Sequence, residues 1–163
     1  MAQKFSISTE GVKQGKFKGG SSRKGWEGAS ECLHFHEEVK VPYDTNRGHT
    51  TGKRIWETLE IIKEVDPASP LYLTACCNNE TIKTAVLKFW RPSKDGKETN
   101  HYTITLTNAA VVSVEQWFGN DAAHTEERDT FEKEKIKFSF QQIDIVWTDG
   151  GKSFSDSWDQ PVA

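Results

Sequence analysis

The stretch of residues 66–79 contains the only convincing helix signal in a chain that is otherwise patterned as strands. Ser69 can cap a helix with its hydroxyl, and Pro70 suits the first helical position because the N–H that proline lacks has no partner there. The asparagine pair at the end of the stretch can take the left-handed conformation that ends a helix. The sequence therefore predicts a short α-helix over about residues 69–79.

The predicted helix is apolar on nearly every side, and its apolar residues are Leu71, Tyr72, Leu73, Ala75, Cys76 and Cys77. A helix this short is not stable alone in water, and one that is apolar all round has to be buried. We therefore expect it to plug a β structure or to be covered by another subunit. Its two adjacent cysteines are best interpreted as small packing residues of a protein made in a reducing cytoplasm.

The segments on either side of this helix alternate apolar and polar residues, which is typical of half-buried strands. The clearest pair is 82–90 and 101–107, with an Asp-Gly turn signal between them, so a β-hairpin is expected. In its second strand Tyr102, Ile104 and Leu106 should point inward, and His101 and the threonines between them should point outward.

The segment 131–147 predicts a long strand in which the buried face changes. Its apolar residues change parity between Phe140 and Ile143, which predicts a bulge or a sharp bend near Gln141 and Gln142. Together the patterns amount to about eight strands and one helix with no β–α–β rhythm. They indicate a mainly β fold, an antiparallel β-barrel or sandwich, and the length of 163 residues fits one domain spanning the whole chain.

Residues 42–54 are a polar excursion between two strong strand patterns. They predict a long protruding loop or hairpin, and long ordered loops in compact domains usually have a function. The segment from Ile55 to Val65 that follows is expected to be one continuous strand, rich in β-branched and aromatic residues.

Composition excludes several classes of function. Charged residues make up 28% of the chain and the net charge is -3, which argues for a soluble protein and against a dedicated nucleic-acid binder. The first residues lack the continuous apolar region of a secretory signal, and no stretch approaches the roughly 20 apolar residues of a membrane span. We therefore expect neither nucleic-acid binding nor membrane insertion.

The segment 32–41 carries side chains of the types that bind zinc. Strand alternation places Cys32, His34 and His36 on one face and Leu33 with Phe35 on the other. No further ligands are signalled elsewhere in the chain. These residues are therefore interpreted as exposed or interface positions of a half-buried strand.

Asp121, His124 and Glu126 combine carboxylates with a histidine in the polar, acidic stretch 119–130. Acid–base catalysis needs buried carboxylates with perturbed pKa values, whereas this stretch reads as a solvated loop without a catalytic motif. We therefore expect no catalytic residues, no metal site and no cofactor.

The order of these features resembles the Hcp family (haemolysin-coregulated protein), the tube subunit of the bacterial type VI secretion system. The match runs through Ile62–Leu71 and Ala75–Cys77, and its most specific part is Asp66–Leu71 followed by Ala75 and Cys76. The other matching segments are Lys24–Glu27, Gly48–Thr50, Tyr102–Leu106, Val111–Val114, Glu127, Phe131 and Ile136–Trp147. The resemblance covers nearly the whole chain.

This resemblance implies a β-barrel subunit that assembles as a homohexameric ring. Rings would stack into a tube inside a contractile sheath, with a spike protein and baseplate components as partners and effector proteins in the lumen. It implies no enzyme activity, and it implies export from the bacterial cytoplasm by this machine without a signal peptide. The helix, with Ser69, Pro70, Leu71, Leu73, Cys76 and Cys77, would then be structural, and a charged residue at position 73 should disrupt folding or ring assembly.

The loop of residues 42–54 is, on this interpretation, the contact to the next ring, with Tyr43, Asp44, Asn46, Arg47 and His49 as the candidate stacking residues. Three other interpretations of the chain stay open at this point. One is a phage-type tail-tube protein, another is a monomeric ligand-binding β-sandwich that uses its tryptophans, and the third is an enzyme that uses the histidine of the 119–130 stretch.

Overall fold

The computed structural model of the protein describes residues 4–118 and 132–158. Within these ranges it contains ten strands and one helix: β1 (Lys4–Gly11), β2 (Gly15–Lys16), β3 (Ser30–His36), β4 (Val39–Lys40), β5 (Ile55–Trp56), β6 (Leu59–Glu64), α1 (Ser69–Cys77), β7 (Thr81–Pro92), β8 (Glu98–Phe118), β9 (Glu132–Trp147) and β10 (Lys152–Ser157). The predicted mainly β fold with one short helix is confirmed.

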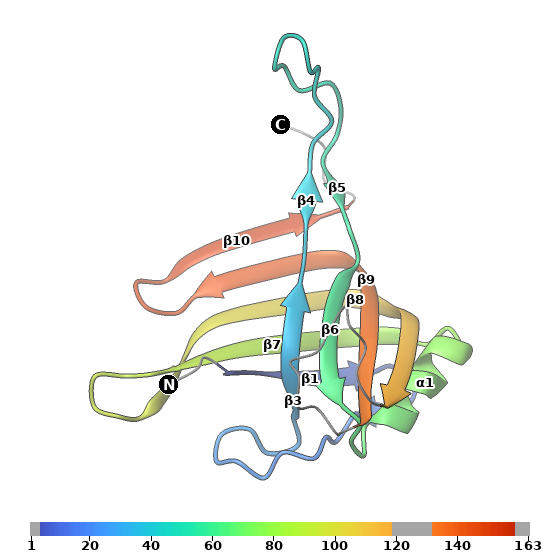
Figure 1. The fold of residues 1–163 in the computed structure, drawn as a ribbon, viewed down its shortest axis with the longest axis vertical. Coiled ribbons are helices and arrows are strands. Elements are labelled where there is room, and N and C mark those ends of the chain that lie inside the picture. The colour runs from blue at the N-terminus through green and yellow to red at the C-terminus, as the bar shows by residue number, and fades with distance from the viewer. Residues whose placement is uncertain (1–3, 119–131, 159–163) are drawn as a thin grey trace.

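Six of the strands close into an antiparallel barrel. The sheet runs in the order β10-β9-β6-β3-β1-β7-β8, and a further pairing of β8 with β9 closes the ring from β9 to β8 (Figure 1). β10 lies outside the ring of six, where it pairs with the second half of β9. Helix α1 packs on β8 at one end of the barrel, and the β7–β8 and β9–β10 turns lie at the other end.

The inside of the barrel is one apolar cluster built from the inward faces of the strands. Leu59 and Ile61 of β6, Leu87 of β7, Leu106 of β8 and Phe138 of β9 are fully buried in it. Burying each such side chain contributes about 1.5–3 kcal/mol. The alternation that predicted the 82–90 and 101–107 hairpin is therefore the alternation that fills the barrel, and that hairpin is confirmed.

The two longest strands bend together at matching positions. In β9 both Phe140 and Ile143 are buried, so the inward face changes parity between them as the sequence predicted. Opposite this point Asn108 of β8 has a positive φ of 48°, and its Nδ2 donates to Gln141 Oε1 at 3.0 Å. The bend lets β9 pair with β6 up to Phe138 and with β10 from Gln142 on.

Three expectations about strands were wrong. In β3 a register shift between Cys32 and His34 breaks the alternation, so that Cys32 is buried and Leu33 is 54% exposed. The expected strand 55–65 is divided into β5 and β6, because the chain leaves the hairpin before it enters the barrel. His101 is only 8% exposed instead of pointing outward, because its ring packs edge-on against a tryptophan of β9.

Helix α1 lacks the expected side-chain cap and does not plug the barrel, which was one of the two ways of burial expected for it. Its N-cap is Ala68, which makes no capping hydrogen bond with its side chain, and Ser69 already lies in the first turn. Only one face is buried in the subunit, whereas Leu73 is 37% exposed and Cys77 is exposed, since the helix covers the barrel from outside. The end of the helix is as predicted, because Asn79 has a positive φ of 51°.

Among the residues that the structure describes, no helix combines the length and the apolar character needed to cross a membrane.

Candidate functional site

The hairpin of residues 41–54 projects from the barrel beyond every other described segment (Figure 1). Its tip is ordered by its own backbone: Asp44 N donates to His49 O, and Gly48 N donates to Asp44 O, each at 2.7 Å. Gly48 has a φ of 72°, a conformation that favours glycine. The predicted protruding loop is therefore a structured β-hairpin.

The tip presents polar and aromatic side chains to the outside. Tyr43 is 63% exposed and Asn46, Arg47 and His49 are also exposed, whereas Asp44 is half-buried and its Oδ1 accepts the Asn46 N–H at 2.9 Å. The five candidate stacking residues thus lie together on one projecting element. Nothing within the described part of the subunit covers them, so the hairpin is suited to contact another molecule.

The root of the hairpin is tied to β10 by a contact that sequence reasoning missed. The guanidinium of Arg54 pairs with the Asp156 carboxylate, with Nη2 donating to Oδ1 at 2.7 Å, and Trp56 Nε1 donates to the same carboxylate at 2.8 Å. The bonds from Arg54 and Trp56 hold the pKa of Asp156 below its usual range. Because the partners are about a hundred residues apart in sequence, no local pattern could have revealed this anchor.

The neck of the hairpin, which consists of residues 37–40 and 55–57 around the β4–β5 pair, holds a carboxyl group with one oxygen that has no partner among the described residues. Glu37 Oε1 accepts the N–H of Glu38 at 2.9 Å, but Oε2 is buried without a hydrogen-bond partner among the described residues. Burial raises the pKa of Glu37 to about 7, and the charges of Glu57 and Glu38 add to this effect. Glu57 itself pairs with Lys40 at 2.9 Å. The neck therefore contains a group that titrates near neutral pH.

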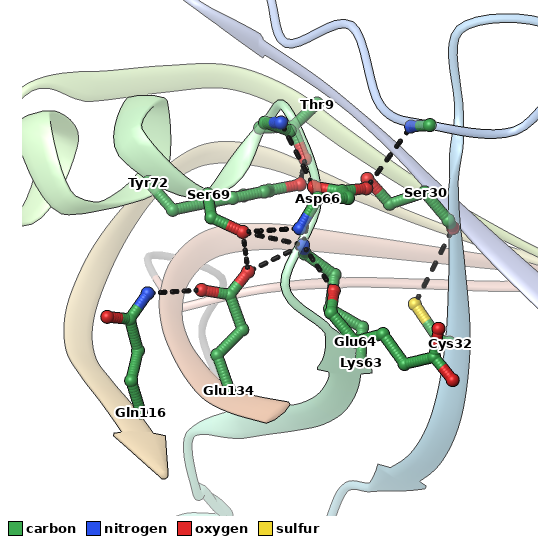
Figure 2. Close-up of polar contacts among 12 residues, drawn as sticks. Thr9, Ser30, Cys32, Lys63, Glu64, Asp66, Ser69, Tyr72, Gln116 and Glu134 are labelled. Atoms are coloured by element: carbon green, nitrogen blue, oxygen red, sulfur yellow. Dashed lines mark hydrogen bonds and ion pairs between the residues drawn. The ribbon is translucent and has the colours of Figure 1, made fainter. Parts of the chain in front are cut away.

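A second polar arrangement lies between α1 and the barrel, where Lys63 of β6 and Glu134 of β9 are both fully buried (Figure 2). Lys63 Nζ lies 2.5 Å from Glu134 Oε1 and 2.8 Å from Asp66 Oδ1. Ser69 Oγ donates to Glu134 Oε1 at 2.7 Å and accepts the Asp66 N–H at 2.9 Å. The hydroxyl expected to cap the helix thus joins the helix to two strands.

The charges in this network are balanced by hydrogen bonds. Burial raises the pKa of Asp66, but the hydrogen bonds that it accepts, led by the one from Lys63, outweigh burial and hold its pKa below the ordinary value. Tyr72 shares a 2.7 Å hydrogen bond with Thr9, and burial raises the pKa of its hydroxyl. Because every charged group is paired, the network fixes the helix on the barrel and offers no reactive group to a substrate.

The zinc-type side chains of β3 do not come together. Cys32 is buried and burial raises the pKa of its thiol, whereas His34 and His36 are exposed. Among the described residues, no group of three or more histidine, cysteine or acidic side chains could hold a metal ion. The acidic stretch with Asp121, His124 and Glu126 lies outside the residues that the structure describes.

Comparison with known proteins places this geometry in a family. A family model described as "Type VI secretion system effector, Hcp" matches residues 7–147. The chain is also similar to the "Major exported protein" of Pseudomonas aeruginosa, with 29% identity over an alignment of 172 residues that covers 100% of this chain and 99% of the relative.

Solved structures share the fold over almost the whole length. The Hcp1 protein from the E. coli EAEC 042 pathovar has a TM-score of 0.85 at 25% identity, with 96% of this chain and 99% of that chain covered. The secreted protein Hcp3 from Pseudomonas aeruginosa has a TM-score of 0.79 at 23% identity and covers 98% of this chain and 100% of its own, a likeness of fold alone.

Proposed function

This chain belongs to the Hcp family of type VI secretion system proteins, and from that premise we propose that it is a structural tube subunit. The chain forms homohexameric rings, and the rings stack into a tube that a contractile sheath surrounds. The observation that carries the proposal is the family match over residues 7–147 together with a fold shared from end to end with Hcp structures.

Two features support contacts between neighbours within a ring. β10 is the last strand of the sheet and pairs only with β9 among the described strands, so no described strand covers its outer edge, and a strand of another subunit could pair there. Phe154 of β10 is 49% exposed and Trp158 beyond it is 48% exposed. An exposed strand edge flanked by aromatic side chains suits a contact with a second copy of the chain.

The outer face of α1 supports a second contact of the same kind. Leu73 and Cys77 are exposed on a helix that carries no charged residue in its first or last turn. We place this face near the adjacent subunit of the ring. The helix is then covered on one side by its own barrel and on the other by its neighbour, which combines the two alternatives that its composition left open.

The hairpin of residues 41–54 makes the contact between rings. It is held at its root by Arg54 and ends in the exposed candidate stacking residues, and its direction carries it past its own barrel (Figure 1). Contacts in which each subunit uses two different surfaces repeat from copy to copy, and they close into rings or extend into filaments. A tube of stacked rings requires one contact of each type.

The partners proposed with this role are the spike protein, the sheath and the baseplate components, together with effector proteins in the ring lumen. The similarity to a protein named for its export supports release of this chain from the bacterial cytoplasm by the same machine. We propose no enzyme activity for the chain, because the polar groups between α1 and the barrel are paired in a structural network.

Shortening the hairpin tests the role in stacking. Residues 44–52 are replaced by a two-residue Asn-Gly turn, and the size of the particles is measured by analytical ultracentrifugation and electron microscopy. We expect intact hexameric rings that no longer stack, because the anchor at Arg54 and the barrel are retained. The thermal midpoint of the ring serves as the folding control, and undiminished tube formation by this variant would refute the proposed contact.

A further inference from the structure

A cavity of about 750 Å³ lies between the β7–β8 and β9–β10 turns, at the end of the barrel away from α1. Its lining includes Arg91, Lys94 and Asp95 of the first turn region, Asn100 and His101 of β8, and Asp149 of the second turn. This volume is within the range of sites that hold ligands or partner segments. Neither the barrel core nor the hairpin described above uses these residues.

Two polar atoms in the lining are buried without partners within the described residues, namely Asn100 Oδ1 and His101 Nδ1. His101 is 8% exposed, and Asn100 already uses its Nδ2 to donate to Thr103 Oγ1 at 2.9 Å. Burial and the nearby Arg91 lower the pKa of His101, which favours the neutral imidazole. Buried polar groups in native proteins nearly always have a hydrogen-bond partner. An amide-like group of a partner molecule would supply the missing hydrogen bonds to Asn100 Oδ1 and His101 Nδ1.

The rim of the cavity carries charges of both signs. The guanidinium of Arg91 lies over the ring of Trp147, 5.1 Å from its centroid, and no ion pair joins it to another described residue. Lys94, Asp95 and Asp149 likewise have no ion pair within the part of the chain that the structure describes. A partner segment for this site would therefore carry an amide, an acid and a base close together.

The hairpin tip carries this set of groups. Asn46 provides an exposed amide, Arg47 a cation and Asp44 a carboxylate, within four consecutive residues. The tip residues bond only to other residues of the hairpin among those described, so their remaining donors and acceptors face outward. The tip extends about 20 Å past the β4–β5 pair at roughly 3.3 Å per residue, and it projects to the side of the barrel, not toward the end where the β7–β8 and β9–β10 turns lie (Figure 1).

We propose that this cavity receives the tip of the protruding hairpin from a second copy of the chain. The amide of Asn46 then forms hydrogen bonds with the two unpartnered atoms, Asn100 Oδ1 and His101 Nδ1. Arg47 faces Asp95 and Asp149, and Asp44 faces Arg91 and Lys94. Each copy gives a hairpin at one end and a cavity at another, which is the heterologous arrangement that repeats along a tube. The inference rests on the proposed stacking and adds the surface that receives the hairpin.

Disulfide trapping between two differently sized chains tests the docking. Both chains carry Cys77→Ser, because Cys77 is the exposed native thiol. One chain carries Arg47→Cys with a mass tag, and the other carries Asp149→Cys. After the two assembled proteins are mixed, disassembled, reassembled and oxidised, we expect the mixed disulfide dimer in at least tenfold greater yield than in the control, in which Lys83→Cys replaces Asp149→Cys. Lys83 is exposed on β7 at the α1 end of the barrel.

The outcomes separate this docking from the stacking on which it rests. Stacked rings with equal trapping at positions 149 and 83 would overturn the docking and leave the stacking in place. Absence of stacked rings in the unmodified protein would overturn both. A charge exchange gives a second measurement: Arg47→Asp and Asp149→Arg should each shorten the tubes, and the double variant should recover at least half of the lost length, whereas no recovery would count against the contact.

Discussion

The buried pair of Lys63 and Glu134 allows the effect of one substitution to be worked out in advance. Lys63→Met keeps the length of the side chain but removes the ammonium that binds both Glu134 and Asp66. Two carboxylates then lose their common partner, one of them fully buried and the other 15% exposed. Removing one partner of a buried ion pair costs about 3–5 kcal/mol.

This cost is large beside the total stability of a chain of this size. Domains have free energies of unfolding of about 5–15 kcal/mol, and in a chain of 163 residues each kcal/mol moves the thermal midpoint by about 2–4 °C. We therefore expect Lys63→Met to lower the midpoint by about 6–20 °C. Glu134→Gln should cost less, about 1–3 kcal/mol, because Asp66 still pairs with Lys63.

Urea unfolding followed by tryptophan fluorescence measures the effect, at a protein concentration that keeps the assembly state constant. The double variant with both substitutions should lose less than the sum of the two single losses, because each substitution already breaks the shared pair. Lys40→Met is the matched control, since it breaks a 2.9 Å ion pair with Glu57 whose side chains are 54% and 44% exposed. Equal free energies of unfolding for Lys63→Met and Lys40→Met, measured in urea, would refute the assignment of a structural role to the buried network.

Three further predictions concern the hairpin and the helix. Burial raises the pKa of Glu37 from 4.5 to about 7, so the folded neck binds the proton more tightly than the unfolded chain does. The stability of the neck should therefore fall as pH rises from 4.5 to 7 and stay level above pH 7. Protease cleavage in the hairpin should become faster over the same pH range, and Glu37→Gln should remove this pH dependence. Arg54→Met should speed that cleavage several-fold while the urea midpoint of the barrel changes little, since the ion pair with Asp156 anchors only the root; an unchanged cleavage rate would argue against the anchor. Leu73→Lys should leave the isolated subunit folded but prevent hexamer formation, whereas Ala75→Lys, at a fully buried position, should unfold the subunit. Sedimentation measures assembly and circular dichroism measures folding, and a normal hexamer of the Leu73 variant would show that α1 is not in the interface.

The features that the sequence predicted are those that depend on near neighbours in the chain. Strand alternation located the β7–β8 hairpin, and the parity change at Phe140 and Ile143 located the bend of β9. The position of α1 followed from its proline and from the asparagine that ends it. Even the projecting hairpin could be recognised as a polar interval between two strands, because its pairing is local.

The features that the sequence did not predict depend on contacts between distant residues. The bulge at Leu33 reverses the faces of β3, and only the pairing with β6 reveals it. Ser69 was expected to cap the helix, but Lys63 and Glu134 bind its hydroxyl in the folded chain. The root anchor between Arg54 and Asp156, and the cavity lined by Asn100 and His101, likewise form only when the barrel closes.

The mass of the native assembly tests the central claim most directly. Native mass spectrometry of the purified protein, with electron microscopy of the same sample, should show a ring of six copies of the 18.5 kDa chain, about 111 kDa, together with stacks of such rings at high concentration. A particle of 18.5 kDa at every concentration tested would contradict the account of this chain as a tube subunit.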